Sequence, residues 1–133
     1  MAYFLAKTDP ETYSIDDLER DGTTEWDGVR NPTAVNAIKT MKPGDRVVIY
    51  HSQGETAVVG LAEVVSPPRP DANDPKSWVA DFKYIRHAKK YVTLREIKAS
   101  HKFDDWLLVR QSRLSTMSAP PEFWTWLKER GVF

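Results

Sequence analysis

The stretch W-D-G-V-R-N-P, residues 26–32, carries an aromatic ring, an acid, a glycine, a cation and a helix-start signal within seven positions. Asn31 followed by Pro32 predicts a helix start, because Asn can cap a free backbone N–H and Pro has none to lose at the first position. The glycine permits a turn that would hold Trp26, Arg30 and Asn31 near the positive end of that helix, as in a recognition loop. The alternative is that Trp26 fills the core and Arg30 pairs with a carboxylate.

The composition predicts one domain over residues 1–133, long enough to bury a sizeable core. There are no cysteines, which excludes a disulfide framework, a cysteine-based zinc site and a thiol nucleophile. The apolar runs are only a few residues long, so no helix is expected to span a membrane. The start of the chain resembles neither a transit peptide nor a signal peptide. We therefore expect a cytoplasmic monomer without metal or cofactor.

Hydrophobic patterns predict short strands and short helices joined by brief connections. Gly60 interrupts one strand and predicts a bulge or a close neighbour. The proline-rich residues 66–75 are expected to form a loop that cannot join a sheet interior. Because short connections exclude repeated βαβ crossovers, we predict an α+β fold with a small, mostly antiparallel barrel. The expected strands are 2–7, 46–51, 56–65, 78–86 and a short one after 115. The expected helices are 15–20, 32–41, 93–99 and one ending before Gly131, and residues 103–109 are either a helical turn or a strand. The Ser14 hydroxyl is expected to cap the first of these helices, and the T-x-x-E pattern of Thr93 and Glu96 predicts a capping box that opens the third.

Charge is unevenly distributed although the chain is neutral overall. Residues 1–82 carry 8 basic and 14 acidic side chains, whereas residues 83–133 carry 11 and 5. Much of the basic excess lies between Lys83 and Lys102, where only Glu96 is acidic. Such a run can contact phosphates in a salt-dependent way. The alternative is an ordinary solvated face.

The common enzyme motifs for phosphate, dinucleotide, nucleophile-elbow and zinc chemistry are absent from the sequence. Its three histidines, at positions 51, 87 and 101, lack metal-ligand spacing. Aromatic residues are more informative. Five tryptophans exceed what a core of this size needs, and Trp26 and Trp78 are candidate walls of a slot that stacks a flat ring.

Taken together, several motifs resemble the EVE domain family over nearly the whole chain. The W-D-G-V-R-N block and the Y-H-S triplet carry most of the specificity. Pro32 departs from the family pattern, in which an aromatic or other residue often follows the asparagine. The segments that carry the resemblance are 3–10, 13–14, 26–31, 41–45, 50–52 and 112–115.

The resemblance implies a PUA-like fold, a curved and mostly antiparallel β-barrel flanked by short α-helices. It also implies a non-catalytic reader of a modified base, such as methylated or hydroxymethylated cytosine or methylated adenine, flipped out of DNA or RNA. Trp26 would stack on the base, with Trp78 as a candidate opposite wall. The other residues implied at the pocket or its rim are Lys7, Arg30, Asn31, Tyr50, His51, Ser52, Arg113, Leu114 and Ser115, and the expected phosphate contacts are Lys83, Arg86, Lys89 and Lys90.

Two other functions remain open from the sequence. Related PUA-like ASCH proteins hydrolyse acylated cytosine nucleosides, and Lys7 with a carboxylate such as Glu63 would be the candidate pair for that reaction. The second alternative is a barrel that binds a small molecule or a protein and never meets a base.

Overall fold

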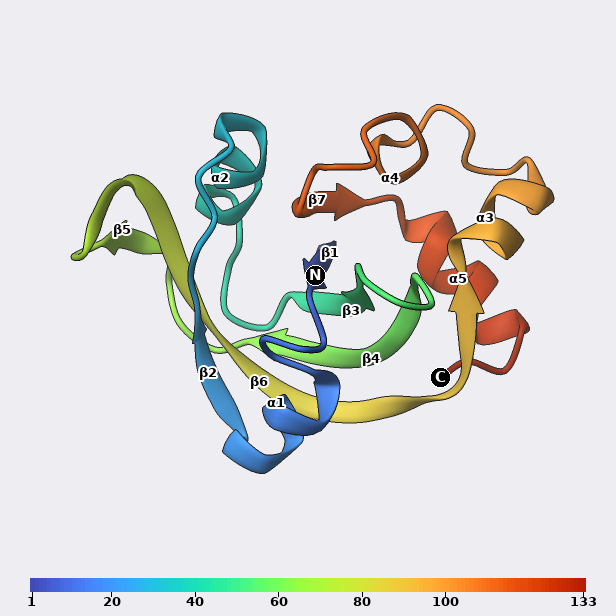
Figure 1. Ribbon diagram of the computed structural model, residues 1–133, viewed down its shortest axis with the longest axis horizontal. Helices are drawn as coiled ribbons and strands as arrows, with labels where there is room; N and C mark the ends of the chain where they lie inside the picture. The colour runs from blue at the N-terminus through green and yellow to red at the C-terminus, as the bar shows by residue number, and fades with distance from the viewer.

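The computed structural model describes all 133 residues and contains a curved seven-stranded sheet with five short helices (Figure 1). The hydrogen-bonded strand order is β2-β6-β4-β3-β1-β7, and β5 pairs with β6 outside this path. The strands are β1 (Tyr3–Thr8), β2 (Thr23–Trp26), β3 (Arg46–His51), β4 (Ala57–Val64), β5 (Arg69–Asp71), β6 (Asp74–Thr93) and β7 (Thr116–Ala119).

Three of the helix starts predicted from the sequence are confirmed by side-chain caps. Ser14 and Thr93 each form a reciprocal capping box with the acid three residues later. Asn31 accepts hydrogen bonds from the N–H groups of Thr33 and Ala34. The helices are α1 (Ile15–Asp21), α2 (Pro32–Lys39), α3 (Leu94–Ser100), α4 (Leu107–Arg110) and α5 (Pro121–Glu129).

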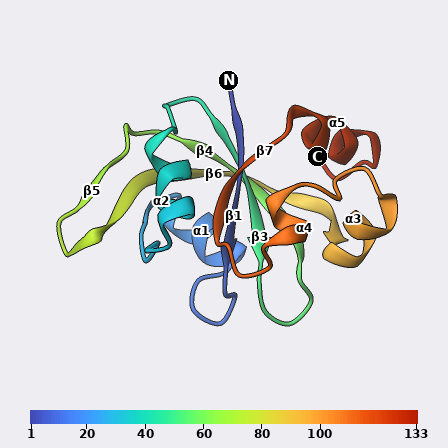
Figure 2. The same cartoon turned by 90° about the horizontal axis from the view of Figure 1, so that it is seen from above.

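The predicted α+β class with a curved, mostly antiparallel barrel is confirmed, and the barrel is open. Only β1 and β3 pair in parallel, and the two end strands, β2 and β7, do not pair with each other. Helix α2 lies on the side of the β5–β6 hairpin, whereas α3, α4 and α5 gather at the other side of the molecule (Figures 1 and 2). None of the five helices combines the length and the hydrophobicity that a membrane-spanning helix needs.

A continuous apolar cluster joins the inner faces of the central strands to the helices. Gly60 sits within it at the irregular pairing of β4, where the register shifts against both β3 and β6. A Cβ added at Gly60 would lie 2.3 Å from the Ile15 Cδ1 atom. The close neighbour expected from the sequence is therefore Ile15 of α1.

One strand was not predicted from the sequence, and one loop prediction was wrong. Residues 23–26 form β2, because the end of α1 returns the chain alongside β6. The segment predicted as loop 66–75 contains β5 and the start of β6. Its prolines are tolerated because β5 pairs with β6 alone and its other edge is free.

Candidate functional site

A cavity of about 370 Å³ opens where the end of β1, the connection from β2 to α2 and the turn before β7 meet. Its volume falls within the roughly 300–1,000 Å³ that is usual for small-molecule sites. The turn before β7 lies beside the end of β1 (Figure 2), and the Lys7 N–H donates to the Ser115 carbonyl at 2.7 Å. The lining residues are Lys7, Thr8, Thr12, Tyr13, Thr24, Glu25, Trp26, Asp27, Gly28, Val29 and Ser115.

Trp26 borders this cavity from the end of β2 while remaining mostly buried, with 7% of its surface exposed. Its indole stacks on Phe82, with ring centroids 5.1 Å apart and planes 25° from parallel. Tyr13 meets it edge-on at 6.4 Å. The indole is thus both a core residue and part of the cavity wall, so the two sequence interpretations of Trp26 are compatible.

Lys7 brings a cation into the same cavity from the end of β1. Its ammonium donates to the Ser112 carbonyl at 2.9 Å and lies 5.6 Å from the centre of the Tyr50 ring. Burial lowers the pKa of this lysine below its ordinary value. Tyr50 lies beneath the lysine, 2% exposed, and therefore supports its stem and orientation instead of facing a ligand.

The wall opposite the turn before β7 is built by the segment that leads into α1. The Thr8 hydroxyl donates to the Tyr13 carbonyl at 2.7 Å, and the Tyr13 hydroxyl donates to Asp21 at 2.8 Å. His51 accepts the N–H of Ile15 through Nε2 at 3.1 Å, which fixes the first turn of α1 to β3. Burial lowers the pKa of His51, which favours the neutral form that can accept this bond.

The remaining polar groups of the lining come from β2 and the residues after it. Asp27 and Gly28 follow Trp26 directly, and Gly28 has a φ of +76°, a conformation that favours glycine. Asp27 makes no ion pair within 4.0 Å, so its carboxylate is available as an acceptor at the cavity mouth. The cavity thus combines an aromatic wall, a cationic donor, an acidic acceptor and several hydroxyls.

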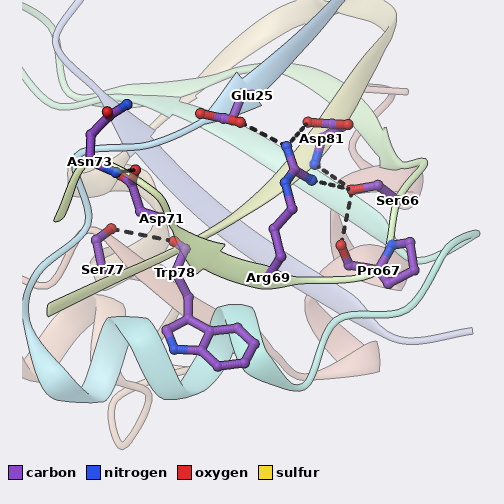
Figure 3. Close-up of polar contacts among 9 residues, drawn as sticks. All are labelled: Glu25, Ser66, Pro67, Arg69, Asp71, Asn73, Ser77, Trp78 and Asp81. Atoms are coloured by element: carbon purple, nitrogen blue, oxygen red, sulfur yellow. Dashed lines mark hydrogen bonds and ion pairs between the residues drawn. The ribbon is translucent and has the colours of Figure 1, made fainter. Parts of the chain in front are cut away.

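An arginine-centred network holds β2 against the β5–β6 hairpin (Figure 3). One Arg69 nitrogen contacts Glu25 at 2.7 Å and Asp81 at 3.0 Å, and another donates to the Ser66 hydroxyl. Because Glu25 precedes Trp26 on β2, this network fixes the strand that carries the indole. Its partial exposure makes it a positioning device of modest energy.

Of the sequence-predicted site residues, Lys7, Trp26 and Ser115 line the cavity together. His51 and Ser52 lie outside the lining and act on its walls: the Ser52 N–H donates to the Thr8 carbonyl at 3.0 Å. Leu114 is buried beside Ser115, and Arg113 is exposed on the same turn.

Arg30 and Asn31 are engaged elsewhere, contrary to a direct role in lining the cavity. Arg30 forms an ion pair with Asp74 at 3.0 Å and tethers the start of α2 to the β5–β6 hairpin. The Asn31 side-chain oxygen is used by the cap of α2. Arg30 and Asn31 thus tether and cap the start of α2 and so help to position Trp26, whereas residues 24–29 line the cavity.

Trp78 does not form the opposite wall. The Trp78 ring points toward α2 (Figure 3), where the Lys39 ammonium lies 5.0 Å from its centre. Trp78 pairs with Pro70 on the hairpin and is absent from the cavity lining. The aromatic that accompanies Trp26 is instead Tyr13, whose place next to the Ser14 cap gave little sign of this role.

The four expected phosphate contacts on β6 also lie outside the cavity lining. Lys83 pairs with Thr23, at the opposite end of β2 from Trp26. Arg86, Lys89 and Lys90 follow farther along β6, and all four residues are exposed. The Arg86 guanidinium lies 5.7 Å from the centre of the Phe133 ring.

Glu63 is not brought to Lys7. It forms an ion pair with Arg46, and that pair lies four residues along the sheet from the pair of Lys7 with Tyr50, about 13 Å at the usual strand rise. The carboxylates that do line the cavity are Glu25 and Asp27, which spacing in the sequence did not single out.

Comparison with known proteins relates this chain to one family and to one group of curated relatives. The model of the EVE domain matches residues 2–130. Thymocyte nuclear protein 1 of Rattus norvegicus is 32% identical, with 74% of this chain and 56% of the relative covered. The human protein of the same name is 30% identical, with 75% and 57% covered. The chain thus spans about half the length of the curated relatives it matches.

Solved structures share the fold closely. A protein of Agrobacterium tumefaciens aligns with a TM-score of 0.92 at 32% identity, covering 98% of this chain and 93% of that one. The human THYN1 protein, in a complex with DNA containing 5-methylcytosine, aligns with a TM-score of 0.86 at 27% identity and 97% coverage of both chains. A YTH domain from Zygosaccharomyces rouxii, at 16% identity and a TM-score of 0.61, shows likeness of fold alone.

Proposed function

The chain belongs to the EVE domain family, and we propose that it is a non-catalytic reader that takes a modified base of DNA or RNA into the cavity beside Trp26. The observation that carries the proposal is the open space of about 370 Å³ next to a mostly buried indole, with Lys7 and Asp27 in the same lining. The complex of the human THYN1 protein with DNA containing 5-methylcytosine supports a methylated base as the ligand.

The lining offers the groups that base recognition requires. A flat ring placed beside Trp26 gains roughly 1–3 kcal/mol from stacking. Lys7 can donate to acceptors on the ring, and Asp27 can accept from an exocyclic amine. Both the acceptors and the donors on the edge of a base therefore have a partner in the lining. These gains must exceed the few kcal/mol needed to unstack the base. One added methyl contributes only about 0.8 kcal/mol, so discrimination between modified and unmodified bases should be several-fold to tenfold.

Phosphate contacts follow from the position of the cavity. Arg113 is exposed on the turn that contributes Ser115, and we expect it to contact the phosphate of the bound nucleotide. The basic residues of β6 lie outside the lining, so we expect them to contact flanking nucleotides. Arg86, Lys89 and Lys90 follow Lys83 along β6, away from the segment of β6 that pairs with Trp26.

Binding assays with matched oligonucleotides test the proposal. Fluorescently labelled 12-nucleotide strands and duplexes would carry one 5-methylcytosine, 5-hydroxymethylcytosine or N6-methyladenine, or no modification, and anisotropy would be measured at low salt. We expect one modified base to bind several-fold more tightly than its parent. Lys7→Met should abolish that preference, whereas Lys128→Met, at an exposed position of α5, should not. Equal and negligible binding to the whole panel would overturn the proposal.

The hydrolase alternative loses its candidate pair because Lys7 and Glu63 lie on separate parts of the sheet. Incubation with N4-acetylcytidine provides the direct check, and the reader proposal expects no release of acetate. A release that is abolished by Lys7→Met would favour hydrolysis instead.

A further inference from the structure

Two larger hollows lie away from the Trp26 cavity, at the side of the molecule where α3, α4 and α5 gather (Figure 1). Their volumes are about 640 Å³ and 570 Å³. They adjoin, since Lys102, Phe103 and Glu122 line both. The nucleic-acid function proposed above uses neither of them.

The floor of these hollows is aromatic. Phe103 contacts Trp106 and Trp126 at ring-centroid distances of 6.0 Å and 5.6 Å, and Phe123 packs between them from α5. The Trp106 indole N–H donates to the Ser118 carbonyl at 2.9 Å, which fixes that ring at the edge of β7. Only 6% of the surface of Phe103 and 7% of that of Trp126 is exposed, so the floor is rigid and already packed.

The rim is acidic. Asp104, Asp105 and Glu122 line the first hollow and Glu122 and Glu129 the second, against the single permanent cation Lys102. Asp104 and Asp105 have partners in His101 and Arg110, at 3.3 Å and 3.1 Å. Glu122 and Glu129 make no ion pair within 4.0 Å. The carboxylate shared by both hollows is therefore unpaired.

An aromatic floor with an acidic rim favours a guanidinium over any anion. Arginine stacks on aromatic faces and pairs with carboxylates at the same time. The chain already shows this chemistry, because the Arg130 guanidinium lies 4.8 Å from the centre of the Trp126 ring. Since that contact and the stack on Phe123 cover Trp126, the ring left for an incoming arginine is the partly exposed Trp106. A nucleic-acid backbone, by contrast, would meet four carboxylates here.

We propose that the paired hollows form a docking surface for an arginine-bearing, extended segment of a partner protein. Glu122 is the central carboxylate, and side chains at alternate positions of the segment would enter the two hollows, because residues i and i+2 of an extended chain point to the same side. The surface is separate from the Trp26 cavity, so the chain would hold a nucleic acid and a protein at once.

The test uses the peptide Ac-Ala-Arg-Ala-Arg-Ala-NH2 and its glutamate counterpart Ac-Ala-Glu-Ala-Glu-Ala-NH2. Amide and indole N–H signals of the 15N-labelled chain would be followed by NMR during titration. We expect the arginine peptide to move the Trp106 and Trp126 indole signals saturably, while the glutamate peptide leaves them in place. The double variant Glu122→Gln, Glu129→Gln should weaken binding at least fivefold, and Lys102→Gln should strengthen it.

Glu11→Gln provides the matched control, because Glu11 is exposed in the loop before α1 and outside both hollows. Its spectrum and affinity should equal those of the parent chain. Equal binding of both peptides, or unchanged affinity in the double variant, would overturn the proposal. Displacement of the arginine peptide by an unmodified 12-nucleotide strand at the same indole signals would also overturn it, by marking the surface as one for nucleic acid.

Discussion

The indole of Trp26 lies stacked on Phe82, with ring centroids 5.1 Å apart, while it also borders an open cavity. One face of the indole is therefore committed to the core, and only the remaining surface is free for a ligand. A substitution of Trp26 can therefore change both the stability of the fold and the affinity for a ligand, whereas a substitution of an exposed aromatic would change mainly the affinity. It also means that substitutions of Trp26 must be chosen to keep the stack on Phe82.

Trp26→Phe and Trp26→Ala should differ in kind. The alanine variant loses the packing on Phe82 and should lower the free energy of unfolding by about 3–5 kcal/mol. The phenylalanine variant keeps a ring and should stay folded while binding a modified oligonucleotide several-fold more weakly, since the smaller ring stacks over less area. Urea denaturation and anisotropy measure the two effects. Trp124→Phe, whose indole stacks on Tyr3, is the control that should leave binding unchanged.

How far the sequence predicts this site depends on the range of the interactions involved. Caps at Ser14, Asn31 and Thr93 are local, and the sequence predicts them correctly. Trp26 was predicted as a wall of the site from the residues around it, whereas Lys7 was predicted only through the family resemblance. Asp27 follows Trp26 directly in the sequence, whereas Tyr13 joins the lining because the fold brings it edge-on to Trp26. Its contact with Trp26 is between segments 13 residues apart, which no local pattern indicates.

The same limit explains the misplaced residues. Trp78 alternates correctly along its strand, yet the hairpin that carries it lies beside α2, and no local pattern indicates which neighbour a hairpin will meet. The basic residues of β6 are exposed, but they are absent from the cavity lining, because the pairing of β6 with β2 and β4 decides which part of the strand meets the cavity. Arg30 and Asn31 are conspicuous in sequence for reasons of helix start and tethering.

Gly60→Ala should destabilise the fold by about 1–3 kcal/mol, the usual cost of overpacking a core. The new Cβ would lie 2.3 Å from Ile15 Cδ1 and 3.1 Å from the Arg86 carbonyl oxygen. Shortening the neighbour should restore part of the loss, so Gly60→Ala with Ile15→Ala should be more stable than the sum of the two single changes implies. Urea denaturation of all four proteins gives the coupling, and strict additivity would contradict the proposed clash.

The stability contributed by His51 should fall as the pH drops below about 6.5, the ordinary histidine value. Burial lowers the pKa of His51 in the fold, so the unfolded chain binds the proton more readily within this window. Protonation also removes the acceptor that Nε2 offers to the Ile15 N–H. Unfolding measured from pH 8 to pH 5 should show a smaller pH dependence in His51→Gln. An unchanged slope would contradict the assignment.

Substitutions of Arg113 and of the β6 lysines should affect the binding of oligonucleotides of different length. With a four-nucleotide strand carrying the preferred base, Arg113→Gln should lower affinity and reduce the salt slope by about one charge, because one phosphate contact is lost. The double variant Lys89→Gln, Lys90→Gln should leave this short strand unaffected, since these residues lie outside the cavity lining. With a 12-nucleotide strand the double variant should also reduce the slope if flanking nucleotides follow β6. Salt titrations by anisotropy distinguish the cases, and a loss for the short strand in the double variant would contradict the placement of the cavity.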